Sequence, residues 1–419
     1  MRYVQQDVKE TAGQEIPLWR NGDFLLLWGG QTISAVGNSI STLSFPLLIL
    51  FLTKSPGQLG LISAVSVLPY ITLSLFAGAL IDRLNRKLVM ICCDIGRMVN
   101  VASIPLALWL GHLTIAQIYI MAVFEGILFV FFNLASSAAL PRLVGRRQLT
   151  EATAVYQTSD NLASFVGSPL GGLLYAISPA CPFIADAISY GTSVLSLSLI
   201  KGPFQLKQAR SASKNIGQEV QAGLLWLWRH PVVRFLAFLT ASFGLVAFSN
   251  TIVLVVLAQR QDASPTLIGA LLTAIGVGSF LGTLAGPVLS KRLPSHIVII
   301  GTLVLAACCC LLYVVIHTLW VLAFICTSIS FLWSLYSVVQ FSYRLSLIPD
   351  ELQGRVNSVF RLLVFVFRLF GQIAIGALLQ YQSARALLTG IGLYFAVLAG
   401  ITLLNPRMRA VSSTQTMEV

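Results

Sequence analysis

The sequence predicts an all-α membrane protein with twelve transmembrane helices arranged as two pseudo-symmetric six-helix bundles. Composition is the first observation: 56% of the 419 residues are hydrophobic and 10% are charged, whereas soluble domains carry about 25% charged residues. The second observation is a series of long apolar runs, and the third is a weak repeat between the two halves. Twelve helices of ~20 residues need about 240 residues, so the chain has room for twelve spans and one longer linker.

Apolar runs long enough to cross a hydrocarbon core recur along the whole chain. We expect helices at residues 24–52, 58–82, 86–110, 113–139, 150–175, 179–200, 232–258, 265–290, 295–316, 319–345, 355–380 and 384–404. The domains are then a cytoplasmic segment (1–23), an N-terminal six-helix bundle (24–200), a cytoplasmic linker (201–231), a C-terminal six-helix bundle (232–405) and a cytoplasmic tail (406–419). The first segment is polar and lacks a basic-then-apolar pattern, so we expect no cleaved signal peptide.

The two halves repeat one another weakly at an offset of about 204 residues. Gly167 and Gly172 of the first half match Gly371 and Gly376 of the second, and apolar pairs match in the same register. Such a duplication is the expected build of a transporter whose two halves rock about a central site.

The net charge of +12 follows membrane topology and needs no polyanionic ligand. Alternate loops hold nearly all the Lys and Arg, and the opposite loops hold only Lys54, Arg260 and Arg385. By the positive-inside rule, this asymmetry places both termini in the cytoplasm and the chain in an inner or plasma membrane, with no nucleic acid as partner. Within the linker, Trp226 and Trp228 belong to an amphipathic stretch suited to the lipid headgroup layer.

Several function classes lack the motifs that they require. The chain has no G-x-x-x-x-G-K-[ST] loop, which excludes ATP-driven transport by this chain alone. The seven Cys lack metal-ligand spacing, and the four His stand apart at loops or helix ends. We therefore expect no metal, no cofactor and no enzymatic activity.

The stretch Gly78-Ala-Leu-Ile-Asp-Arg-Leu-Asn-Arg-Lys87 forms a short loop between two predicted helices. Gly78 is expected to let a neighbouring helix come close, because it has no side chain. Asp82 lies about one turn further on, where it is suited to contact the positive N-terminus of another helix or a basic partner. Arg83, Arg86 and Lys87 mark this loop as cytoplasmic.

This stretch resembles the signature loop between the second and third helices of the major facilitator superfamily. It departs from the family pattern at Asn85, where the family usually has Gly, and we expect Asn85 to supply the left-handed turn instead. By this resemblance, Asp82 and Arg86 latch the cytoplasmic face against the start of the eleventh helix, where Gly354 and Arg355 fall.

Further segments narrow the resemblance to one branch of that superfamily. They include Asn21–Leu25, Asp94–Arg97, Pro141–Val144, Gly167–Gly172, Asp186–Tyr190, Trp228–Arg234 and Ile348–Leu352. Together these segments look like the exporter branch that includes the enterobactin exporter and the macrolide efflux proteins. The resemblance implies alternating access, usually with proton-coupled antiport, that moves small organic molecules out of the cytoplasm.

The run Gly167-Ser-Pro-Leu-Gly-Gly172 resembles a fifth-helix motif associated with antiporters of this superfamily. Pro169 removes a helix hydrogen bond, while Gly167, Gly171 and Gly172 allow a close contact that can slide. The motif favours export over uptake.

Ionisable residues inside a membrane are costly and are functional candidates by default. The first half has four such carboxylates, Asp94, Glu125, Asp160 and Asp186, whereas the second half has none at depth. A proton-coupled carrier needs a carboxylate that can load and release a proton near neutral pH, which removal from water makes possible. We therefore expect the proton site in the first half.

Glu125 is the first candidate, because it lies mid-helix with no base within a turn, on a helix that lines the central cavity in this superfamily. A neutral Glu125 hydrogen-bonded to another helix is an equal alternative. Asp186 ranks second, with packing or capping as its alternative, and Asp160 ranks behind it, with a structural role favoured. Asp94 and Arg97, one turn apart, are expected to form an ion pair that tethers the third helix near the gate.

Polar and aromatic side chains on the expected cavity helices are candidate substrate contacts. They are Gln31, Ser34 and Asn38 in the first helix, Asn250 in the seventh, and Trp333, Tyr336 and Gln340 in the tenth. Small polar residues also join helices, so about half of this set is expected to touch no ligand. Arg368 is suited to attract an anionic substrate or to pair with a first-half carboxylate, although an interhelical role is favoured.

These observations predict a monomeric antiporter that exchanges protons for a small amphiphilic molecule, such as a drug, a siderophore or another secondary metabolite. Its partners are this substrate, protons and the lipid bilayer. Two alternatives stay open: an importer or uniporter of the same fold, and a non-transporting membrane scaffold or sensor.

Overall fold

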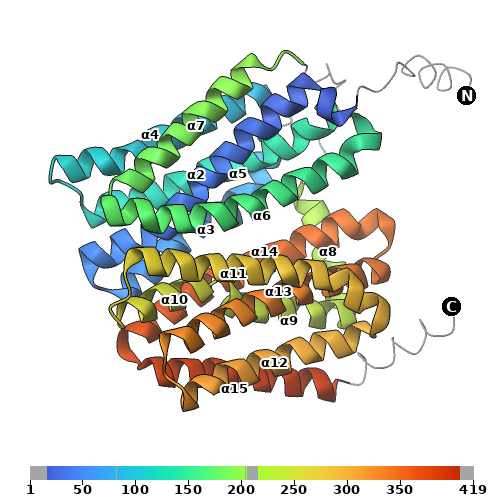
Figure 1. Ribbon diagram of the computed structural model, residues 1–419. Helices are drawn as coiled ribbons and strands as arrows, with labels where there is room; N and C mark the ends of the chain where they lie inside the picture. Colours follow the sequence, from blue (N-terminus) through green and yellow to red (C-terminus); the bar gives the residue numbers. More distant parts are fainter. Residues whose placement is uncertain (1–16, 82, 203, 205–215, 406–419) are drawn as a thin grey trace, which may run out of the picture.

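The computed structural model describes residues 17–81, 83–202, 204 and 216–405, which form two helical bundles side by side (Figure 1). The first bundle contains η1 (Leu18–Arg20), α2 (Gly22–Thr53), α3 (Pro56–Ile81), α4 (Arg86–Trp109), α5 (Ile115–Leu143), α6 (Gly145–Ile177) and α7 (Cys181–Leu199). The linker helix α8 (Ile216–Arg229) comes next. The second bundle contains α9 (Pro231–Ala247), α10 (Asn250–Gln259), α11 (Pro265–Arg292), α12 (Ser295–Val315), α13 (Leu319–Leu347), α14 (Asp350–Tyr381) and α15 (Ala384–Leu404).

Ten segments of the described chain are long and apolar enough to cross a membrane, and α9 and α10 together make one of them. Helices α6 and α7, of 33 and 19 residues, are not two of these ten, but they pack beside α2 and would bring the count to the predicted twelve. The all-α membrane fold is thus confirmed, and the predicted bounds agree to within a few residues. The count of twelve spans stays a prediction.

The two ends of the molecule differ in how closely the bundles approach. We call the end that holds the connection between α7 and α8 the linker end, and the end that holds the short turn between α2 and α3 the far end. Across the boundary between the bundles, α3 packs on α14 and α6 packs on α11.

At the far end the bundles touch through their backbones. A Cβ added to Gly376 of α14 would come within 2.7 Å of the Gly60 Cα of α3. A Cβ added to Gly172 of α6 would come within 3.1 Å of the Gly269 Cα of α11. Because only glycine permits so close an approach, these two glycine pairs close the far end.

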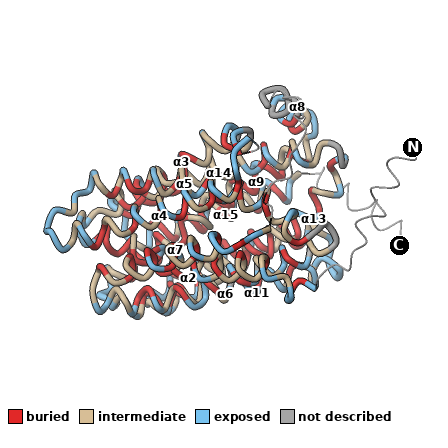
Figure 2. Tube along the Cα trace, turned by 90° about the horizontal axis from the view of Figure 1, so that it is seen from above, coloured by how far each residue is buried: buried red, intermediate tan, exposed pale blue. Residues whose placement is uncertain are grey.

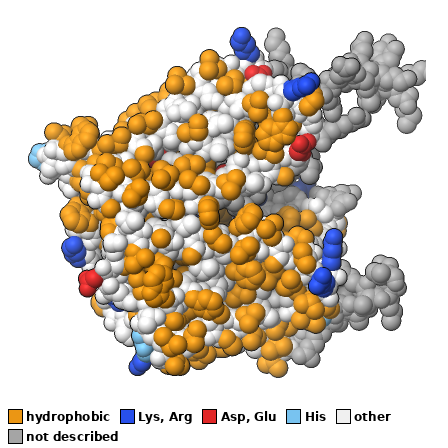
Figure 3. Space-filling model, in the orientation of Figure 1, with side chains coloured by type: hydrophobic (Ala, Val, Ile, Leu, Met, Phe, Trp, Pro, Cys, Tyr) orange, Lys and Arg blue, Asp and Glu red, His pale blue; other side chains and the backbone are white. Residues whose placement is uncertain are grey.

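At the linker end the bundles stand apart. Figure 3 shows a hollow between them at this end. A Cβ added to Gly78 of α3 or to Gly354 of α14 would meet no described atom within 4 Å. The close contact that we expected at Gly78 is therefore not made in this conformation, because α3 and α14 have separated at this end.

Local capping sets where many helices begin. The side chains of Asn21, Thr114, Ser264, Thr318 and Ser383 each accept a hydrogen bond from a first-turn backbone N–H. Asn85 does the same for α4, where its side chain accepts from the N–H groups of Lys87 and Leu88. Its φ is −69°, so the left-handed turn that we predicted is wrong. Asn is suited to this position because it is a strong N-cap residue.

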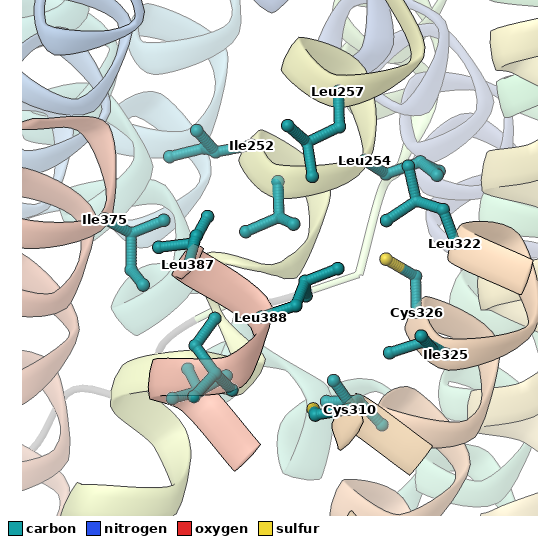
Figure 4. Close-up of a cluster of buried hydrophobic side chains, with 14 of the residues drawn as sticks. Ile252, Leu254, Leu257, Cys310, Leu322, Ile325, Cys326, Ile375, Leu387 and Leu388 are labelled. Carbon is teal, nitrogen blue, oxygen red and sulfur yellow. The ribbon is translucent and has the colours of Figure 1, made fainter. Parts of the chain in front are cut away.

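The predicted helix 232–258 is interrupted in its middle. Helix α9 gives way at Phe248 and Ser249, and α10 begins directly after them. Figure 4 shows α10 residues Ile252, Leu254 and Leu257 in an apolar cluster with side chains of α12 to α15. The sequence does not reveal this interruption, because residues 248–250 include neither proline nor glycine.

Helix α8 packs on the outside of the second bundle (Figure 2). A Cβ added to Gly223 would come within 2.9 Å of the Arg355 carbonyl oxygen of α14. Leu227 is buried together with Val356, while Trp228 stays exposed. The linker helix is thus attached to the start of α14, and its contact with lipid headgroups stays a prediction.

Candidate functional site

A buried polar cluster lies inside the first bundle, where α4, α5 and α7 meet. The Nε and Nη2 atoms of Arg97 each lie 2.6 Å from Oε1 of Glu125. The Arg97 guanidinium also lies over the Tyr190 ring, 4.5 Å from its centroid. Arg97 and Tyr190 are buried, whereas the Glu125 side chain is 26% exposed. One ion pair and one cation–π contact therefore connect three helices.

One hydroxyl group holds Asp94 in the same region. The Ser193 hydroxyl donates a hydrogen bond of 2.6 Å to Asp94 Oδ2, and it accepts one of 2.9 Å from the Gln31 amide. Asp94 is fully buried, and its Oδ1 has no hydrogen-bond partner among the described residues. The series Gln31–Ser193–Asp94 thus links α2, α7 and α4.

Asp186 of α7 lies against α2 and is 1% exposed. A Cβ added to Gly37 would come within 2.8 Å of its Oδ1. The Ser189 hydroxyl donates to the Asp186 backbone carbonyl at 2.7 Å and lies 3.4 Å from Oδ1. In the described part of the chain, no base lies within ion-pair distance of this carboxyl group. Burial of an unpaired carboxylate is costly, so Asp186 stays a functional candidate.

The ion pairing differs from our expectation. Arg97 pairs with Glu125 of the neighbouring helix and not with Asp94 one turn away, so the predicted Asp94–Arg97 pair is wrong. The base that Glu125 lacks on its own helix comes from α4, a contact that spacing along the sequence cannot reveal. Asp160 is exposed on α6 and does not join this cluster.

Two bases of the signature stretch hold the first bundle together at the linker end. The Arg86 guanidinium donates a hydrogen bond of 2.8 Å to the Ala138 carbonyl of α5. The Lys87 ammonium donates to the Ser198 and Ile200 carbonyls at the end of α7, at 3.0 and 2.8 Å. These contacts tie α4 to α5 and α7.

The remaining gate candidates belong to the loop after α3 and to the start of α14. Asp82 lies outside the described residues, and Arg83 is exposed. Gly354 faces open space at the start of α14, while the neighbouring Arg355 backbone supports α8. The latch between the signature loop and the start of α14 stays a prediction.

Three of the predicted cavity residues lie inside the second bundle. The Asn250 amide donates to the Cys326 carbonyl of α13 at 2.7 Å. Tyr336 is fully buried and shares a hydrogen bond of 2.8 Å with Thr240 of α9. Gln340 is 3% exposed. In this conformation the first two join α13 to its neighbours, and Gln340 is enclosed.

The candidates on α2 lie in three different environments. Ser34 is buried, Gln31 donates to Ser193, and Asn38 is exposed. Along the face of α2 that carries Asn38, Ile49 nearer the far end is only 1% exposed. This face is therefore exposed toward the linker end and buried toward the far end. The glycine pairs bring the bundles together at the far end, which explains the difference.

Arg368 of α14 lies in an aromatic cluster at the boundary between the bundles. Its guanidinium carbon is 4.9 Å from the centroid of Phe248 and 5.8 Å from that of Phe365. The Phe248 ring packs on Trp333 at 5.4 Å, and the Phe365 ring stacks at 4.0 Å on Tyr70 of the first bundle. The sequence pointed to Arg368 and Trp333 but not to the other three rings, because aromatic residues in apolar helices carry no distinguishing pattern.

The glycines of the fifth-helix motif allow α6 to approach two neighbours, α2 within the first bundle and α11 of the second. Gly167 and Gly171 face α2, where a Cβ on Gly171 would come within 2.7 Å of the Ile40 carbonyl oxygen. Gly172 faces the other bundle. Pro169 lies inside α6, which runs without interruption from Gly145 to Ile177.

Known proteins are similar to this chain over most of its length. The family model of the Major Facilitator Superfamily matches residues 27–372. The chain belongs to the major facilitator superfamily. It is therefore a transporter and not an enzyme.

Two relatives lie in the exporter branch that the sequence resembles. The chain is 24% identical over 404 residues to the multidrug efflux pump Tap of Mycolicibacterium fortuitum, covering 93% of this chain and 97% of that protein. It is 25% identical over 391 residues to the enterobactin exporter EntS of Escherichia coli O1:K1, covering 91% of each. A solved structure of a mutant nucleoside transporter NupG superposes with a TM-score of 0.76 at 12% identity, over 91% of this chain and 99% of that one. The last likeness shows the fold alone.

Proposed function

We propose that this transporter exports small amphiphilic organic molecules in exchange for protons, by alternating access. The observation that carries the proposal is the cluster in the first bundle, where Asp94, Glu125 and Asp186 accompany one base, Arg97. Three carboxyl groups around one guanidinium in a buried site are most stable when the cluster also holds protons. Gain and loss of those protons would then couple to the movement of the bundles.

The direction of transport rests on the relatives and on the charge pattern. Both relatives are named for export, Tap as an efflux pump and EntS as an exporter. Basic residues gather at the linker end, which the positive-inside rule assigns to the cytoplasm, in a plasma membrane. With the far end closed and the linker end open, the described conformation would face the cytoplasm. An exporter collects its substrate in that state.

Reconstituted vesicles with an imposed pH gradient test the coupling, with enterobactin and the dye Hoechst 33342 as probes. We expect the gradient to accelerate transport and an ionophore that collapses it to abolish the acceleration. Asp186→Asn should keep substrate exchange but lose the acceleration, because its carboxyl group can no longer change protonation.

Asp160→Asn is the matched control, since it changes an exposed carboxylate of the same bundle. It should behave like the unchanged protein. Transport of both probes at the same rate with and without the gradient would instead support a uniporter. If both Asp186→Asn and Glu125→Gln keep full coupling, the proton site lies outside this cluster.

A further inference from the structure

One face of α14 runs along the boundary between the bundles. Arg361, Phe365 and Arg368 follow at spacings of four and three residues and so share one helical face. The Arg361 guanidinium lies 3.4 Å from the Tyr70 hydroxyl of α3, and Phe365 stacks on the same tyrosine. This face therefore looks toward the first bundle. Farther along it, Gly376 makes the backbone contact that closes the far end.

Arg368 lies on this face between Arg361 and the contact at Gly376 that closes the far end. Arg361 is exposed on the linker side, whereas Arg368 is partly buried before the closed far end. A solute that enters between the bundles from the linker end would meet one cation, then an aromatic ring, and then a second cation. Two cations on one path raise the local concentration of anions.

The Arg368 guanidinium lacks a counter-charge in the described part of the chain. Its Nε is buried without a hydrogen-bond acceptor, and no described carboxylate lies within ion-pair distance. Arg97 of the first bundle also packs on an aromatic ring, but it has Glu125 at 2.6 Å. A partly buried guanidinium with unused donors is stabilised by an anion that accepts two parallel hydrogen bonds.

The surroundings of Arg368 are aromatic on several sides. Phe248 and Phe365 flank the guanidinium, while Trp333 and Tyr70 pack behind those two rings. Flat apolar surfaces of this kind suit the ring of a ligand whose anionic group reaches the guanidinium.

We propose that Arg368 binds the carboxylate or a similar planar anionic group of an aromatic substrate, with Phe248 and Phe365 holding its ring. This inference rests on the proposed transport function, and it names the substrate class of the same central path. In the alternative, the partner of Arg368 is a carboxylate of the first bundle. The experiment must distinguish this carboxylate from a substrate anion.

Equilibrium binding of tritiated 2-naphthoate to the full chain in lipid nanodiscs tests the proposal. We expect 2-naphthoate to bind about tenfold or more tightly than its neutral analogue 2-naphthamide, as a charge-assisted bidentate pair allows. Arg368→Gln should remove that preference and leave 2-naphthamide binding unchanged, which shows that the variant is folded. Arg368→Lys should keep only part of the preference, because an ammonium cannot form the planar pair.

Arg344→Gln is the matched control, since Arg344 is a buried arginine of the same bundle that packs on the Phe360 ring, 3.7 Å from its centroid, and not on Phe248 or Phe365. It should keep the preference for 2-naphthoate. The proposal is overturned if 2-naphthoate does not bind up to millimolar concentration, if it binds no better than the amide, or if Arg368→Gln binds it as well as the unchanged protein.

These measurements use no gradient, so they separate the two proposals. A failure of proton coupling would leave 2-naphthoate binding intact. A failure of anion binding would leave gradient-driven export of other substrates intact.

Discussion

At the scale of single residues, the two bundles stabilise buried arginines differently. Arg97 has a carboxylate at 2.6 Å, whereas Arg344 and Arg368 lie on aromatic rings. The sequence was sufficient to find the acids of the first half and to rank Glu125 and Arg368 as candidates. It could not show that Arg97 pairs across to Glu125, because that contact depends on how α4 and α5 pack. The part played by Ser193 was equally hidden.

Removal of Arg97 should destabilise the first bundle strongly. Arg97→Met leaves Glu125 without its base, and breaking a buried pair in this way costs about 3–5 kcal/mol of unfolding free energy. Thermal unfolding in nanodiscs measures the loss. Arg97→Met combined with Glu125→Gln should recover most of it, since no unpaired charge then remains. Arg83→Met, which alters an exposed base, is the control, and a double variant no more stable than Arg97→Met would contradict the account.

At the scale of helices, glycine contacts decide where the bundles can approach. The repeat marked Gly172 and Gly376 from the sequence alone, and both lie in the far-end contact. The interruption after α9 was not predictable, because no helix-breaking residue stands there and packing of α10 in the apolar core holds it in place. The lack of a described neighbour at Gly78 was likewise not predictable, because it depends on how α3 packs.

Enlarging Gly376 should open the far end. In Gly376→Ala the new Cβ meets the Gly60 Cα, so the closed far end loses stability and the population shifts toward the state open at that end. Double electron–electron resonance measures the distance between spin labels at Leu52 of the first bundle and Gln261 of the second. We expect this distance to be longer in the variant. Gly78→Ala is the matched control on α3, since its Cβ meets nothing in this conformation. An unchanged distance in Gly376→Ala would count against the glycine contact.

At the scale of the whole molecule, export from the described conformation requires the linker end to face the cytoplasm. Cysteines placed one at a time at Arg385, near the far end, and at Lys291, near the linker end, test this in a background free of native cysteines. A membrane-impermeant maleimide added to intact cells should label the Arg385→Cys variant only. Labelling of the Lys291→Cys variant only would show that the topology is inverted and that the described conformation opens to the outside.

The most direct test of the central claim is whether substrate movement carries protons the other way. Vesicles that contain the purified protein and a trapped pH indicator are loaded with substrate, with equal pH on both sides at the start. We predict that substrate efflux acidifies the lumen, because each outward step returns protons through the cluster of Asp94, Glu125 and Asp186. Asp186→Asn should release substrate with no change of pH. Substrate efflux from the unchanged protein without any proton movement would contradict the account.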